Sequence, residues 1–203
     1  MNETGLAANS GDPPELLVPA ALRGEAEAIA RLFRLEHPAV WRLCLGVLAD
    51  RTEADDAAQD AMLKILDQLD RYDASRPWAT WRNTVAVNVC RDRLRRSAAR
   101  RGAEESAADQ ARPRSIDPAS DPETVASQRE LGELVTAHLG RLSPREREVF
   151  VLHDLEGGAT ADVASALDLA ESTVRVLLMT ARRRLRELLA PRLAGTPTPR
   201  RSP

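Results

Sequence analysis

The sequence predicts an all-α fold made of two small helical domains joined by a flexible linker, with a helix-turn-helix in the C-terminal domain. Three observations support this fold class. Aromatic residues make up only 3% of the 203 residues, and alanine, leucine and arginine dominate, which favours helices over sheets. Apolar residues recur at helical spacing in two separate blocks. The segments outside these blocks are rich in proline, glycine and small polar residues, which have little to bury.

These patterns divide the chain into five segments. They are a disordered tail over residues 1–21, a first domain over 22–96, a flexible linker over 97–127, a second domain over 128–192 and a disordered tail over 193–203. The N-terminus lacks the basic and apolar regions of a signal peptide, and no apolar run approaches the ~18 residues that span a membrane. We therefore expect a cytoplasmic protein without membrane insertion.

The first domain begins with two predicted helices. Apolar spacing predicts a helix over about 24–49, which Pro38 is expected to kink or break. The next helix is expected to start at Thr52, as N-cap of the capping-box-like stretch "TEAD", which ends at Asp55. One face of this second helix is apolar and the other is acidic. The acidic face consists of Asp55, Asp56, Gln59, Asp60 and Asp67.

A third helix of the first domain follows the loop "DRYDASRP". Trp78 and Trp81 continue into Val85 and Val89 at helical spacing, so packing in the core is the first expectation for both tryptophans, with stacking on bases as the alternative. The helix then runs into an arginine-rich stretch, with six arginines against one aspartate over residues 91–101. The net charge of the whole chain is −2, so this basic character is local.

The second domain contains the helix-turn-helix pattern. The stretch "SPRE" is a strong helix start, with Ser143 as N-cap, Pro144 at the first helical position and Glu146 closing a capping box. Further on come a short helix, a tight turn near Asp168 and a long helix that is basic in its second half. Taken alone, this arrangement is only moderately specific for DNA binding.

Little in the sequence indicates catalysis. The two cysteines, Cys44 and Cys90, form no metal-binding or disulfide pattern and are expected to be small apolar residues inside helices. The chain has no glycine-rich phosphate loop, no HExxH and no nucleophile elbow, and its three histidines are isolated. We expect neither enzymatic activity nor a metal or cofactor.

Three stretches in register carry a more specific signal. They are "DRTEADDAAQDAMLKILDQLDRYD", "WATWRNTVAVNVCRDRLRR" and "LGRLSPREREVFVLHDLEGGATADVASALDLAESTVRVLLMTARRRLRELL". Together they resemble the extracytoplasmic-function group of bacterial sigma factors, which have two helical domains and a variable linker. The resemblance implies a factor that binds RNA polymerase core and directs promoter recognition, melting and transcription initiation.

The resemblance assigns the acidic helix face to docking on RNA polymerase core. The residues expected to bind core are Asp55, Asp56, Gln59 and Asp60. An exposed acidic stripe can pair with arginines of a partner and guide its approach. From composition alone the same residues could equally form a solvated face with helix-dipole acids.

The arginine-rich third helix resembles the segment that opens and reads the −10 promoter element, with the loop 72–77 capturing a flipped base. The residues expected to bind −10 DNA are Trp78, Arg82, Asn83, Asn88, Asp92, Arg93, Arg95 and Arg96. The arginines suit the phosphate backbone. Ala79, Thr84 and Val87 stand where the family often has arginine, which predicts weaker or differently arranged contacts.

The second domain resembles the part that reads the −35 element. The residues expected to bind −35 DNA are Arg147, Ser172, Thr173, Arg175, Arg182 and Arg183. Leu177, Met179 and Thr180 replace residues that are typically Arg, His and Arg in the family. Two explanations stay open: apolar contact with thymine methyl groups in an unusual −35 sequence, or a surface that binds a protein.

Two other functions are compatible with parts of the sequence. One is a helix-turn-helix regulator that binds duplex DNA without polymerase, and the other is a helical adaptor that acts only through polymerase or anti-sigma contacts. The acidic stripe argues against the first and the two arginine runs against the second. The resemblance also implies an anti-sigma partner that holds the factor inactive.

Overall fold

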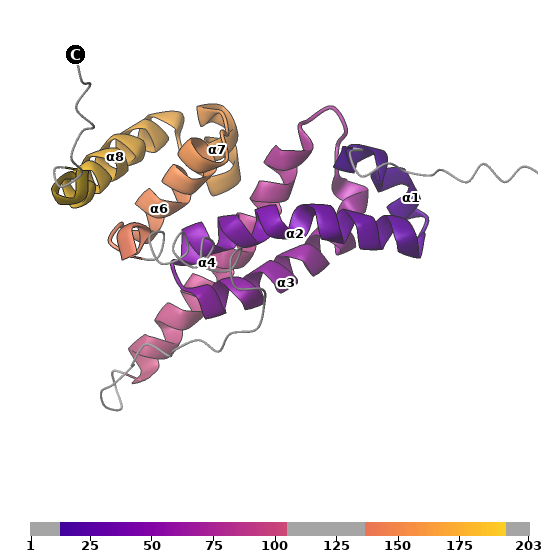
Figure 1. Cartoon of the computed structure of the whole chain (residues 1–203), viewed down its shortest axis with the longest axis horizontal. Helices are drawn as coiled ribbons and strands as arrows, with labels where there is room; N and C mark the ends of the chain where they lie inside the picture. Colours follow the sequence, from indigo (N-terminus) through magenta and orange to yellow (C-terminus); the bar gives the residue numbers. More distant parts are fainter. Residues whose placement is uncertain (1–12, 105–136, 194–203) are drawn as a thin grey trace, which may run out of the picture.

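The computed structural model describes residues 13–104 and 137–193, and every regular element in these two ranges is a helix. The helices form two bodies, one from each range, in agreement with the predicted fold class (Figure 1). The predicted tail from 194 onward and most of the predicted linker lie outside the described residues.

The first body is built around three long helices. They are α2 (Ala26–Leu48), α3 (Arg51–Asp67) and α4 (Trp78–Glu104). Figure 1 shows α2 and α3 running side by side, and both contact α4. The apolar stripes read from the sequence meet between them, and the side chains with almost no exposed surface include Leu32, Leu43, Met62, Ile65 and Val87.

Two predicted segment limits are wrong. Residues expected to belong to a disordered tail instead form η1 (Pro14–Leu16) and α1 (Val18–Leu22), because Leu17, Val18 and Ala21 bury their side chains in the first body. Likewise α4 continues through Glu104, so the expected linker is helical over its first eight residues, 97–104. A helix that extends from an existing helical body needs no new nucleation, which composition alone does not reveal.

Two local predictions in the first body concern Pro38 and Thr52. Helix α2 continues through Pro38, so the expected break does not occur, and the helix packs against both α3 and α4. Helix α3 begins one residue before Thr52, and its N-cap is Asp50, whose carboxylate accepts a hydrogen bond from the Glu53 amide at 2.9 Å. Aspartate and threonine are both preferred N-cap residues, and the helix uses the earlier candidate, Asp50.

The second body follows the sequence reading closely. Its elements are α6 (Pro144–Phe150), the π-helix η3 (Val151–Leu155), α7 (Thr160–Leu167) and α8 (Glu171–Leu193). Ser143 and Glu146 form the predicted capping box. Asp168 takes the left-handed conformation, with φ 54°, that the tight turn between α7 and α8 requires. Of the helix expected before Ser143, residues 137–142 are described, and 137–139 are helical.

The two bodies touch along α2, where small and buried groups allow a close approach. Gly46 of α2 faces Val151 of η3, and a Cβ added at Gly46 would lie 2.9 Å from a Val151 methyl carbon. Beside it, the Arg147 guanidinium of α6 donates to the Leu48 carbonyl oxygen at 2.9 Å. The described bodies are therefore packed against each other.

Candidate polymerase-binding and DNA-binding surfaces

The acidic face of α3 is exposed along its first three turns. Asp55, Asp56, Gln59 and Asp60 all point away from the buried alanine and methionine side of the helix. The Trp41 indole N–H donates to the Asp55 carboxylate at 2.5 Å, so α2 orients one acid of this face. The arrangement gives a partner of opposite charge four polar side chains on one helix surface.

Arg93 of α4 reaches across to the same acidic face. Its guanidinium pairs with Asp60 at 2.5 Å and lies 3.8 Å from Asp56 and 3.4 Å from Glu53. Burial alone would lower the pKa of Arg93, but the hydrogen bond and charge of Asp60 outweigh it, and the pKa is raised. In this structure Arg93 pairs with the acidic face of α3, and its expected contact with −10 DNA stays a prediction.

Trp78 lies in an aromatic cluster at the start of α4. It is only 2% exposed, and its ring packs edge-on against Tyr72 at 5.1 Å and beside Trp81 at 5.2 Å. Both tryptophans pack in the core as expected, Trp78 fully and Trp81 partly, and the contact of Trp78 with −10 DNA stays a prediction. The Tyr72 hydroxyl donates to the Arg76 carbonyl at 3.0 Å, which fixes the loop before α4.

Arg82 and Asn83 are buried between helices rather than exposed on α4. The Arg82 guanidinium donates to Glu36 of α2 at 2.7 Å and to Glu156 of the second body at 3.3 Å. It also donates to the Asn83 side-chain oxygen, and the Asn83 amide donates to Glu156 at 3.4 Å. In this arrangement neither residue is available to DNA, and their contact with the −10 element stays a prediction.

The exposed basic part of α4 lies further along the helix. Arg95 and Arg96 are exposed, whereas Asn88 and Asp92 are half-buried. Asp92 pairs with Arg95, and its carbonyl accepts a hydrogen bond from Arg96 at 3.3 Å. Asp92 therefore orients both arginines toward one side of the helix.

Arg147 is buried at the contact between the bodies. Besides Leu48, it donates to the Leu142 carbonyl at 3.5 Å, and burial lowers the pKa of its guanidinium. The side chain is 7% exposed. Its expected contact with the −35 DNA backbone would require the two bodies to separate at this point.

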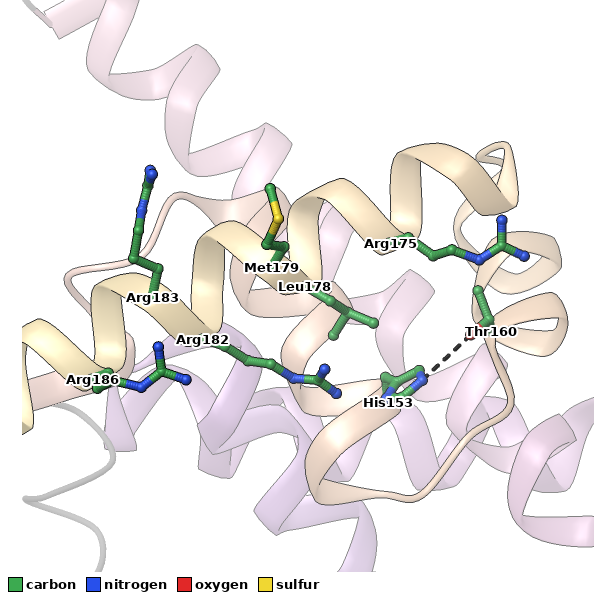
Figure 2. Close-up of a pocket in the computed structure, with 8 residues that line it drawn as sticks. All are labelled: His153, Thr160, Arg175, Leu178, Met179, Arg182, Arg183 and Arg186. Atoms are coloured by element: carbon green, nitrogen blue, oxygen red, sulfur yellow. Dashed lines mark hydrogen bonds between the residues drawn. The ribbon is translucent and has the colours of Figure 1, made fainter.

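The start of α8 presents the other expected −35 residues to solvent. Ser172, Thr173 and Arg175 are exposed in the first turns, and Arg175 pairs with Glu171 at 2.5 Å. Figure 2 shows this helix with arginines on both sides of its exposed surface. The N-terminal turns of such a helix are the part that meets base edges in a major groove.

The arginines in the basic half of α8 differ in the contacts that they make within the protein. Arg182 donates two hydrogen bonds to Asp154, at 2.7 and 2.6 Å, and this pair holds the pKa of Asp154 below its ordinary 3.8. Arg183 and Arg186 are exposed and make no ion pair within the described residues. Arg186 was not among the expected −35 residues, but it is as available to phosphate as Arg183.

The apolar replacements on α8 do not share one environment. Leu177 is half-buried and packs against the core of its own body, whereas Met179 is 64% exposed. Val176, one turn before Thr180, is 57% exposed and was not among the expected site residues. Its spacing of four residues from Ser172 on a helix that begins at Glu171 was the signal that could have found it.

Cys44 and Cys90 are fully buried side by side, as expected for small apolar residues, and both are free thiols. The hydrogen bond that the Cys90 thiol shares with Cys44, together with burial, raises the pKa of Cys90 well above its usual value, which keeps it protonated. In the part of the chain that the structure describes, no helix is long and apolar enough to cross a membrane.

Two protein-family models match the chain in the order of the two bodies. Residues 32–100 match Sigma-70 region 2, and residues 133–185 match Sigma-70, region 4. The ECF RNA polymerase sigma factor SigM of Mycobacterium tuberculosis is 35% identical over 178 residues, covering 85% of this chain and 83% of the relative. SigL of the same organism is 34% identical over 172 residues, covering 82% of this chain and 94% of the relative.

Solved structures share the fold at lower identity. CnrH in complex with the cytosolic domain of CnrY has a TM-score of 0.62 at 24% identity, covering 91% of this chain and all of that one. The sigma factor RpoE in complex with the anti-sigma factor NepR from Bartonella quintana has a TM-score of 0.60 at 22% identity, covering 78% of this chain and 94% of that one. With two matching regions and relatives that align over most of both chains, this protein belongs to the extracytoplasmic-function group of sigma-70 family RNA polymerase sigma factors.

Proposed function

We propose that this sigma factor docks on RNA polymerase core through the acidic face of α3, reads the −10 element with the first body and reads the −35 element with α8. The observation that supports this proposal is that negative and positive charge are exposed on different helices. Asp55, Asp56 and Asp60 are exposed on one face of α3, while Arg183 and Arg186 of α8 are exposed and make no ion pair within the described residues. A protein partner with a basic surface and a DNA duplex would thus meet different faces of the molecule.

Promoter binding requires a rearrangement of the two bodies. Arg82, Asn83 and Arg147 are buried at or beside the contact between them. Binding of core would supply the energy that separates the bodies, and an anti-sigma factor that favours the closed arrangement would oppose it. The factor acts in the cytoplasm, where polymerase works, and contributes no catalysis of its own.

Charge reversal at Asp56 tests the docking surface. Asp56 is exposed, with a side chain 66% accessible and a single weak contact to Arg93 at 3.8 Å, so Asp56→Arg leaves the fold intact. We expect affinity for core polymerase to fall at least tenfold, because an attractive charge becomes repulsive. The assay is titration of labelled protein with core, accompanied by circular dichroism.

The matched control is Asp70→Arg, a charge reversal at another exposed acid of the same body, in η2 (Leu69–Arg71). It changes the net charge equally but lies outside the acidic face. Unchanged core affinity for Asp56→Arg, or an equal loss for both variants, would contradict the docking assignment.

A further inference from the structure

The exposed side of α8 carries two large apolar residues, Val176 and Met179. They are three residues apart, which places them on neighbouring turns of the same surface, and they are 57% and 64% exposed. The buried side of the helix is already filled by Val174, Leu178 and Leu185. Val176 and Met179 are therefore not needed to hold α8 on its own body.

Positive charge surrounds this apolar pair. Arg175 precedes it in the first turns, and Arg183 follows one turn after Met179. In Figure 2, Met179 and Arg183 project from the same side of the helix, while Arg182 points toward His153. Since Arg183 and Arg186 make no ion pair within the described residues, their charge is available to a polyanion at the rim of the pair.

The small size of this apolar pair and the arginines around it indicate which ligand it binds. Two side chains make a patch well below the roughly 300–600 Å² that typically marks a protein-binding site. A rim of arginines suits a phosphate backbone rather than an apolar protein surface. In a major groove, the apolar group offered by bases is the C5 methyl of thymine.

We propose that Val176 and Met179 are specificity-determining residues that contact thymine methyl groups in the −35 element. The proposal rests on the proposed function of α8 as the −35 reading helix and deepens it. Arg175, Arg183 and Arg186 hold the phosphate backbone, and the apolar pair selects T·A pairs at the one or two base steps that it faces. Leu177 takes no part, because it packs against the core.

Replacing thymine by uracil in the DNA tests this contact directly. The substitution removes the C5 methyl and leaves every hydrogen-bonding group of the base in place. Holoenzyme, formed from core polymerase and this protein, first selects from duplexes with a randomised −35 region. The selected duplex is then compared with versions in which each deoxythymidine is replaced singly by deoxyuridine.

We expect the selection to return thymine at one or two fixed positions. At these positions uracil should weaken binding about fourfold, since one methyl group corresponds to ~0.8 kcal/mol and 1.4 kcal/mol to a factor of ten. In Met179→Gln or Val176→Ser the difference between thymine and uracil should disappear at the position that the residue contacts. The matched control is Leu155→Gln, which changes an exposed apolar residue outside α8 and should leave the ratio unchanged.

The possible failures are distinguishable. A selected −35 sequence that is bound equally with thymine and uracil would overturn the methyl contact and leave the proposed function standing. Retention of the uracil effect in both Val176→Ser and Met179→Gln would also overturn it. No selection in the −35 region at all would overturn the proposed function of α8 together with this inference, and would turn attention to a protein partner of the same patch.

Discussion

The buried ion pair between Arg82 and Glu36 gives the sharpest test of the described packing. The two side chains are 9% and 5% exposed and meet at 2.7 Å between α4 and α2. Within the described residues, Arg82 is the only group that pairs with Glu36. Arg82→Leu would therefore leave a carboxylate buried without a partner, which costs about 3–5 kcal/mol of stability.

A double variant separates the lost partner from the lost packing. Arg82→Leu with Glu36→Leu removes both charges and fills the space with apolar groups, and such replacements are often neutral or stabilising. We expect the double variant to recover most of the stability that the single variant loses. Glu156, whose side chain is 16% exposed, keeps its hydrogen bond from the Asn83 amide.

Urea unfolding followed by tryptophan fluorescence measures the loss of stability in the first body. All three tryptophans of the chain, Trp41, Trp78 and Trp81, lie in the first body, where the ion pair is located. A loss below about 1 kcal/mol in the single variant, or a double variant no more stable than the single, would refute the reasoning. It would mean that Arg82 faces solvent and is free for DNA.

Two further predictions concern the contact between the bodies and the base of α8. Gly46→Ala should widen the distance between labels on α3 and α8, because the added Cβ would lie 2.9 Å from a methyl carbon of the stiff Val151 side chain. Adding Val151→Ala to this variant should restore the distance. An unchanged distance in Gly46→Ala would contradict the contact. Asp154→Asn should lower stability at neutral pH by under about 1 kcal/mol, since Arg182 is half-exposed. The folded-state pKa of Asp154 is depressed, so its contribution is complete above the ordinary 3.8 and is lost as pH falls through the folded value. The difference from wild type in urea midpoint should therefore shrink in acid, and a constant difference from pH 7 to pH 3 would contradict the pair.

Local signals in the sequence predicted local structure well. The capping box at Ser143 and the left-handed turn at Asp168 depend on residues within a few positions, and both are confirmed. The N-cap of α3 failed by two residues because Asp50 and Thr52 are equivalent candidates until the neighbouring helix fixes where the chain turns.

The partners of the expected DNA-binding residues were beyond the reach of local patterns. Arg82 meets Glu36, which is 46 residues away, and Arg147 meets the backbone of Leu48, which is 99 residues away. A run of arginines reports positive charge but not which of them is buried. On α8, adjacent residues point about 100° apart, so Val176 and Leu177 face different environments although both are aliphatic.

The measurement that tests the account most directly is run-off transcription by purified core polymerase, with and without this protein, on fragments of the source genome. We expect transcripts that appear only with the protein and share two upstream elements at a fixed spacing. The same reactions with Asp56→Arg should yield none. Absence of any dependent transcript despite confirmed core binding would contradict the assignment as a promoter-directing factor.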